Sequence, residues 1–131
     1  MSSPKIGFAI SLYNKFDELA ILIDIIRKNW KDKYPISVCS NFPDAEKHLK
    51  KLDIDYYVIG DDIKFGKDMS PIQWKINKQC RVFDCIRKSC GGANKLGCDY
   101  VMHLHTDAWP LKEKGVIKLV EELESKNKKL A

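Results

Sequence analysis

His103, His105 and Asp107 alternate along a short stretch near the end of the chain. His103 lies within the apolar run 100–104, which the pattern predicts as a β-strand, and His105 and Asp107 follow that run. Side chains two residues apart on an extended chain point to the same side, so His105 and Asp107 are expected to converge on one ion. Imidazole with carboxylate suits Mn²⁺, Zn²⁺ or Fe²⁺, and carboxylate with phosphate oxygens suits Mg²⁺ or Mn²⁺. The stretch thus predicts a divalent-cation site, with an ordinary loop histidine and an Asp107 cap as the alternative.

The chain around this stretch alternates short apolar runs with segments of helical periodicity. The expected strands cover residues 5–12, 36–39, 56–59 and 100–104, and the expected helices cover about 16–30, 45–52, 73–88 and 116–123. This alternation is typical of an α/β fold, a three-layer sandwich in which a mostly parallel sheet lies between helices. With 131 residues the chain has the size of one ordinary domain, so a single domain over residues 1–131 is expected.

Ligands of parallel sheets bind beyond the carboxyl ends of the strands. Besides the histidine stretch, the sequence places polar groups at the ends of the first three expected strands: Ser11, Tyr13, Asn14, Asn41 and Asp61. We expect these side chains to gather at one edge of the sheet.

Two local signals refine the helices. Asn14 is a suitable cap for the first helix, since its side chain can accept from an exposed backbone N–H. Gly91-Gly92 interrupts the third helical pattern and is expected to end that helix. No glycine-rich phosphate-binding loop of the dinucleotide or P-loop type follows any expected strand.

Composition excludes several classes of protein. The 23 basic and 18 acidic residues give a formal charge of +5. The dense lysine runs at 47–51 and 126–129 fall in segments with helical periodicity, where they are expected to form the solvated side of a helix. No nucleic acid is therefore expected as a partner. The charge is compatible with a small anionic ligand such as a nucleotide. No apolar run is long enough for a transmembrane segment, and the first residues lack the apolar core of a signal peptide, so neither a membrane span nor secretion is expected. Five cysteines without a Cys-x-x-Cys pair indicate reduced thiols and a cytoplasmic protein.

Two motifs in this order of elements suggest a family. The first is Ile10-Ser11-Leu12-Tyr13-Asn14-Lys15, and the second runs from Gly97-Cys98-Asp99-Tyr100 to His105-Thr106-Asp107. Together they resemble the nucleotide-binding half of GT-A-fold glycosyltransferases, particularly the inverting family 2 enzymes. The resemblance covers about residues 5–123, and it implies a GT-A-like fold of the nucleotide-diphospho-sugar transferase type.

The resemblance also implies roles for particular residues. The turn from Ser11 through Tyr13 to Asn14 would contact the nucleotide. Asp107 matches the last acid of the family's Asp-x-Asp motif, which holds Mn²⁺ or Mg²⁺ on the donor diphosphate, and His105 occupies the place of the first acid. Such a cation neutralises charge that develops on the nucleoside diphosphate as the sugar leaves. Arg81, with Lys78, would help to hold phosphate, and surface charge is the alternative role for both.

The second strand end departs from the family pattern. Family members usually carry Asp-Asp there, where an acid reads the base, and this chain has Ser40-Asn41. Asn41 can still hydrogen-bond a base edge, and Asp61 or Asp62 can supply the missing acid.

Three functions remain open at this point. The first is a glycosyltransferase-like domain that binds a UDP- or GDP-type nucleotide sugar through Mn²⁺ or Mg²⁺ and transfers the sugar to an unknown acceptor. No acceptor-side segment remains after Trp109, so the domain is expected to be truncated. The second is a non-catalytic nucleotide-sugar-binding or interaction module, which could form a homodimer across an open sheet edge. The third is a metallohydrolase, because residues 103–107 form a His-x-His-x-Asp string.

Overall fold

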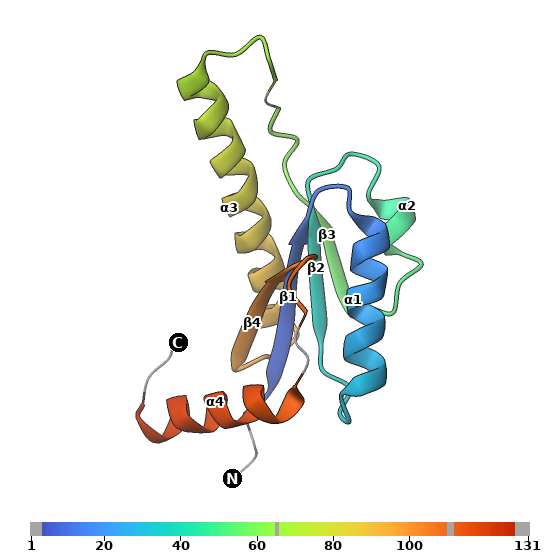
Figure 1. The fold of residues 1–131 in the computed structure, drawn as a ribbon, viewed down its shortest axis with the longest axis vertical. Helices are drawn as coiled ribbons and strands as arrows, with labels where there is room; N and C mark the ends of the chain where they lie inside the picture. The colour runs from blue at the N-terminus through green and yellow to red at the C-terminus, as the bar shows by residue number, and fades with distance from the viewer. Residues whose placement is uncertain (1–3, 65, 110–111, 128–131) are drawn as a thin grey trace.

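The computed structural model describes residues 4–64, 66–109 and 112–127, and within them strands and helices alternate as the sequence predicts (Figure 1). The elements are β1 (Ile6–Leu12), α1 (Phe16–Asn29), β2 (Ile36–Ser40), α2 (Glu46–Leu49), β3 (Tyr56–Ile59), α3 (Pro71–Lys95), β4 (Tyr100–His105) and α4 (Glu113–Ser125). No helix in the described part of the chain is long and apolar enough to cross a membrane.

The four strands form one sheet in the order β3-β2-β1-β4, and every neighbouring pair is parallel. β1 is central, with Phe8 opposite Ile36 of β2 and Ile10 opposite Leu104 of β4. All residues of β1 and β2 are buried, which explains why their sequences are nearly continuous apolar runs. The expected α/β class and parallel sheet are confirmed, and the sheet is parallel throughout.

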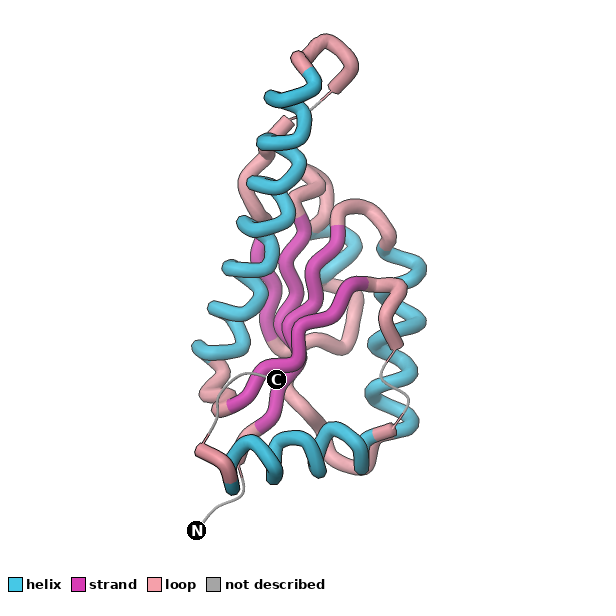
Figure 2. Tube along the Cα trace, turned by 60° about the vertical axis from the view of Figure 1, so that its left-hand side comes forward, coloured by secondary structure: helices cyan, strands magenta, loops and turns pink. Residues whose placement is uncertain are grey.

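The two faces of the sheet are packed by different kinds of side chain. α1 covers one face with large apolar residues, and its Leu19, Leu22 and Ile26 join the core with Phe8. The ring of Phe8 meets Trp30 edge-on, with 5.0 Å between the ring centroids. Val120 of α4 belongs to the same core, and α4 lies across the amino-terminal end of β4 (Figure 2).

α3 covers the opposite face of the sheet and is packed through small residues. Ser89 bonds Ser11 of β1, with 3.2 Å between the two hydroxyl oxygens. A Cβ atom on Gly92 would clash with the Ser37 hydroxyl and with the ring of Tyr56. These small side chains let the helix axis approach the strands closely.

This close approach corrects the expectation that Gly91-Gly92 ends the third helix. α3 continues through both glycines to Lys95, because Gly92 is the residue that fits against β2 and β3. α3 also starts earlier than expected, at Pro71, where Ser70 accepts a hydrogen bond from the Gln73 backbone N–H at 3.2 Å. The amino-terminal half of this long helix extends beyond the sheet (Figures 1 and 2).

The expected capping role of Asn14 is wrong. α1 begins at Phe16 with Lys15 in the cap position, and no side chain caps the helix. The turn before α1 is instead held from β2, because the Ser40 hydroxyl donates to the Tyr13 carbonyl oxygen at 2.7 Å. Asn14 therefore lies one residue outside the position from which a side chain could cap.

Candidate functional site

The strand order creates a natural binding position between β1 and β4. From β1 the chain moves outward to β2 and β3, then crosses back through α3 to β4 on the other side of β1. The crevice at such a reversal, beyond the carboxyl ends of the strands, is where open parallel sheets bind ligands. A cavity of about 170 Å³ lies there, lined by Ser11, Leu12, Tyr13, Asn41, Lys78, Arg81, Val82, Cys85 and His105. We call it the switch-point pocket.

Positive charge enters this pocket from α3. The Arg81 guanidinium lies over the ring of Tyr13, 4.0 Å from the ring centroid. A planar guanidinium stacked in this way keeps N–H groups in the plane of its fork, which suits phosphate oxygens. Lys78 adds a second cation to the pocket lining, and its amine also lies over the ring of Trp74 at 4.9 Å. An anion is therefore the favoured ligand at this wall.

The aromatic wall is itself fixed by packing. Tyr13 meets Phe42 edge-on at 5.4 Å between centroids, and Phe42 meets Phe16 in the same way at 5.9 Å. The turn after β1 is thereby held against the turn after β2, so Tyr13 presents one ring face to Arg81.

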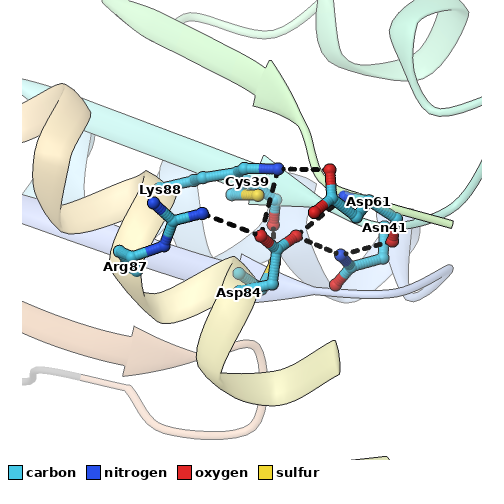
Figure 3. Close-up of polar contacts among 7 residues, drawn as sticks. Cys39, Asn41, Asp61, Asp84, Arg87 and Lys88 are labelled. Atoms are coloured by element: carbon cyan, nitrogen blue, oxygen red, sulfur yellow. Dashed lines mark hydrogen bonds and ion pairs between the residues drawn. The ribbon is translucent and has the colours of Figure 1, made fainter. Parts of the chain in front are cut away.

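Behind the pocket lies a buried carboxylate, Asp84, on the sheet-facing side of α3 (Figure 3). One carboxylate oxygen accepts from the Asp61 backbone N–H at 2.7 Å and from the Asn41 amide at 3.0 Å. The other lies 3.0 Å from the Lys88 amine and 3.3 Å from the Arg87 guanidinium. Every partner is a donor, so the site requires an ionised acid.

The pKa values follow from these contacts. Burial by itself would raise the pKa of Asp84, but the Asp61 N–H and Lys88 together lower it below its usual value. Lys88 also pairs with the Asp61 carboxylate at 2.8 Å, and this contact raises the pKa of Lys88 against the opposing effect of burial. The cluster thus ties α3 to the ends of β2 and β3 with its charges intact.

Asp84 also decides which way Asn41 faces. The Asn41 amide nitrogen donates to both the Asp84 carboxylate and the Asp61 carbonyl, each at 3.0 Å. Both partners are acceptors, so the amide orientation is fixed by chemistry. Among the residues that the structure describes, no donor reaches the amide oxygen of Asn41, and this residue lines the pocket.

A row of polar side chains runs from β1 to β4 beside the pocket. The Ser11 hydroxyl lies 2.9 Å from Nε2 of His103, and the His103 ring meets His105 edge-on at 5.0 Å between centroids. Burial, with a smaller effect of His105, lowers the pKa of His103, so this imidazole is neutral at pH 7. Ser11 and His105 line the pocket directly.

Cys85 forms part of the pocket lining and touches the sheet. Its thiol donates to the Cys39 carbonyl oxygen at 2.8 Å. Contact with the Cys85 thiol and burial both raise the pKa of Cys39, which keeps Cys39 a neutral thiol. Both cysteines are free, and their burial fits the structural role expected for the thiols.

The structure brings together five of the residues expected to bind nucleotide or metal: Ser11, Tyr13, Asn41, Arg81 and His105. Asn14, Asp61 and Asp107 are not among the lining residues. Asn14 lies in the exposed turn before α1, and the Asp61 side chain is paired with Lys88.

The geometric reason for expecting Asp107 beside His105 does not apply. β4 ends at His105, and Thr106 and Asp107 lie in a turn, so the alternation of an extended strand stops before Asp107. The turn is held by the Thr106 hydroxyl, which donates to the Glu18 carboxylate at 3.0 Å. Trp109, in the exposed segment after this turn, donates from its indole N–H to the Thr106 carbonyl at 3.0 Å.

A metal ion at this edge of the sheet would take most of its coordinating atoms from a bound small molecule and water. Within the described ranges, no three His, Cys, Asp or Glu side chains gather as they would around an ion. His105 and Asp107 can supply one imidazole and one carboxylate, a small set that suits Mg²⁺ or Mn²⁺ only with phosphate oxygens and water completing the shell. The His-x-His-x-Asp string does not form a three-ligand cluster, since His103 bonds Ser11.

Three features in and behind the pocket were not predicted from the sequence: the buried acid Asp84, the stacking of Arg81 on Tyr13, and the contribution of Cys85. A signal for the first exists, because Asp84 interrupts the apolar run Val82-Phe83-Asp84-Cys85-Ile86 on a helix that must cover a sheet. The stacking joins residues 68 positions apart, and no local pattern encodes it.

Comparison with known proteins gives no relative. No known protein family, curated protein or solved structure matches this chain.

Proposed function

We propose that this protein binds a nucleoside-diphosphate sugar in the switch-point pocket, as the donor-binding domain of a GT-A-like glycosyltransferase. The observation that carries the proposal is the stacked pair of Arg81 and Tyr13 at the carboxyl ends of β1 and β4, with Lys78 beside it. Two cations and an aromatic ring at a topological switch point match the charge of a diphosphate and the flat face of a nucleotide.

Each part of the donor has a candidate partner. Arg81 and Lys78 bind diphosphate oxygens, while the turn from Ser11 to Asn14 and the oxygen of Asn41 contact the nucleoside. Asp61 lies behind Asn41, and its carbonyl holds the Asn41 amide. A divalent cation, Mn²⁺ or Mg²⁺, would be held by His105 and Asp107 and would supply charge neutralisation at the leaving diphosphate.

Calorimetry with UDP, GDP and their sugars, each with and without Mn²⁺, tests the donor site. Arg81→Gln removes the stacked cation and is expected to weaken binding by about tenfold or more, since a charge-assisted contact contributes about 1.5–3 kcal/mol. Lys118→Gln is the matched control, because Lys118 is an exposed cation on α4 that does not line the pocket. Absence of binding for every nucleotide, or equal losses in the two variants, would reject the proposal.

Metal dependence is tested separately from nucleotide binding. Asp107→Asn is expected to remove the gain in affinity that Mn²⁺ or Mg²⁺ provides, while metal-free binding stays unchanged. Binding accompanied by release of sugar to an acceptor assigns transfer to the domain. Binding with no turnover assigns the alternative, a non-catalytic nucleotide-sugar-binding module.

A further inference from the structure

The projecting half of α3 carries an apolar surface that no other described element covers. Ile72, Ile76 and Phe83 are 73%, 48% and 66% exposed. Their separations of four and seven residues place them on one side of the helix. Scattered exposed apolar residues are ordinary, but three large ones aligned on a single projecting element form a patch.

Two other sides of this half-helix face the rest of the protein. Asn77 turns toward the preceding loop, where its amide donates to the Lys64 carbonyl at 2.9 Å. Arg81 lines the switch-point pocket, whereas Lys78 and Val82 lie between that pocket and the groove that Phe83 lines. None of Ile72, Ile76 and Phe83 lines the switch-point pocket, so the stripe is available to a partner that approaches the helix from outside.

Charge indicates which partner fits. Lys75 and Lys78 line a shallow groove together with Phe83, and the sequence between Pro71 and Phe83 has no anion. A second copy of the chain on this stripe would bring like charges together, whereas an anionic surface would be attracted. Lysines beside an apolar stripe can extend their amines toward phosphate groups while their methylenes remain in an apolar layer.

Aromatic content adds to this match. Phe83 of the stripe also lines a shallow groove along the flank of the helix, and Trp74, Lys75 and Lys78 line the same groove. A helix that combines Phe, Ile and Trp with flanking lysines has the composition of segments that lie in the plane of a membrane interface. Since this half of α3 extends beyond the sheet, the body of the domain does not block a flat surface from reaching it (Figures 1 and 2).

We propose that the stripe formed by Ile72, Ile76 and Phe83 docks the protein on the surface of an anionic lipid bilayer, with Lys75 at its rim. Ile72 and Phe83 enter the boundary between headgroups and acyl chains, and Lys75 contacts the headgroup phosphates. This contact is peripheral, and it does not depend on nucleotide binding.

Vesicle cosedimentation tests the proposal, with phosphatidylcholine vesicles compared with vesicles containing about one third phosphatidylglycerol. The wild-type chain is expected to partition onto the anionic vesicles and to be released by salt, which screens surface attraction. The double variant Ile72→Ser/Phe83→Ser is expected to bind at least about tenfold more weakly, because each side chain buries apolar area in the interface. Lys75→Gln is expected to reduce binding about fivefold at low salt.

Ile21→Ser is the matched control, because Ile21 is 50% exposed on α1, away from the stripe. Circular dichroism and thermal unfolding of each variant verify that the fold is retained. Equal binding to neutral and anionic vesicles, no binding to either, or equal effects of the double variant and the control would overturn the proposal. So would sedimentation analysis showing a dimer that only the double variant dissociates, since a second copy would then be the occupant.

Discussion

Removal of the Asp84 carboxylate is expected to destabilise the fold although α3 itself stays helical. Asp84→Ala deletes the acceptor for the Asp61 backbone N–H and one of the two acceptors for the Asn41 amide. A hydrogen bond to a charged group contributes about 1.5–3 kcal/mol, and Asn41 keeps its bond to the Asp61 carbonyl, so the expected loss is about 3 kcal/mol. Lys88 retains its pair with the Asp61 carboxylate, which limits the further loss.

Urea unfolding measures this loss directly. For a domain of this size a decrease of about 3 kcal/mol lowers the unfolding midpoint by at least about 1 M. Asp84→Asn keeps one acceptor oxygen and is expected to lose about half as much. The matched control is Asp24→Asn, which removes an exposed carboxylate paired with Lys28 at 2.7 Å and should change stability by less than about 1 kcal/mol.

The pH dependence gives a second, independent measurement. The native pKa of Asp84 lies below its usual value, so its stabilising contribution is complete above the unfolded pKa, about 3.8. That contribution is lost as the pH falls through the lower native pKa. The difference in unfolding free energy between wild type and Asp84→Asn should therefore be constant from pH 7 to about pH 4.5 and shrink below it. A difference that does not change with pH, or an alanine variant as stable as the asparagine control at position 24, would refute the role assigned to Asp84.

Two further predictions follow from α3 and from β4. Gly92→Ala is expected to destabilise the fold by about 1–3 kcal/mol, because its Cβ would clash with side chains of β2 and β3. Gly91→Ala, at an open helical position, is expected to stabilise the fold by about 0.5–1 kcal/mol. Urea unfolding that shows a change of the same sign for both variants would contradict the packing of α3. Burial lowers the pKa of His103, so its ring should titrate below 6.5 in NMR. The free energy of unfolding should decrease as the pH drops through the unfolded pKa near 6.5, because the unfolded chain then binds the extra proton. His103→Gln should remove that part of the pH dependence, and an unchanged profile would exclude His103 as its source.

Much of the local structure follows from patterns in the sequence. The apolar runs predict β1 and β2 because strands buried on both faces have no need of polar alternation. The periodicity of α1 predicts its buried face, and Asp17 and Glu18 do lie in its first turn. Two predicted helix ends are wrong, and in each case a tertiary contact decides the structure. Asn14 does not cap because Ser40 holds the adjacent turn, and Gly92 does not end α3 because its lack of a side chain is needed against Ser37.

The candidate site likewise has a part that the sequence predicts and a part that depends on tertiary contacts. Polar residues at the strand ends are visible in the sequence, and the parallel sheet predicts that they share an edge. Their selection into one pocket depends on the strand order, which places β4 beside β1 and brings His105 close to Ser11. The two-residue spacing does not by itself place Asp107 beside His105, because β4 ends at His105 and Asp107 lies in the following turn.

The sequence by itself determined the elements, their parallel arrangement and the polar character of the strand ends, because these depend on periodicity and on the chemistry of neighbouring residues. Only the tertiary structure decided that β1 and β4 are neighbours, that Arg81 stacks on Tyr13, and that Asp84 is buried and ionised. The physical reason is that these features join residues tens of positions apart. Their free energy depends on close packing and on low local dielectric, which appear only when the chain has folded.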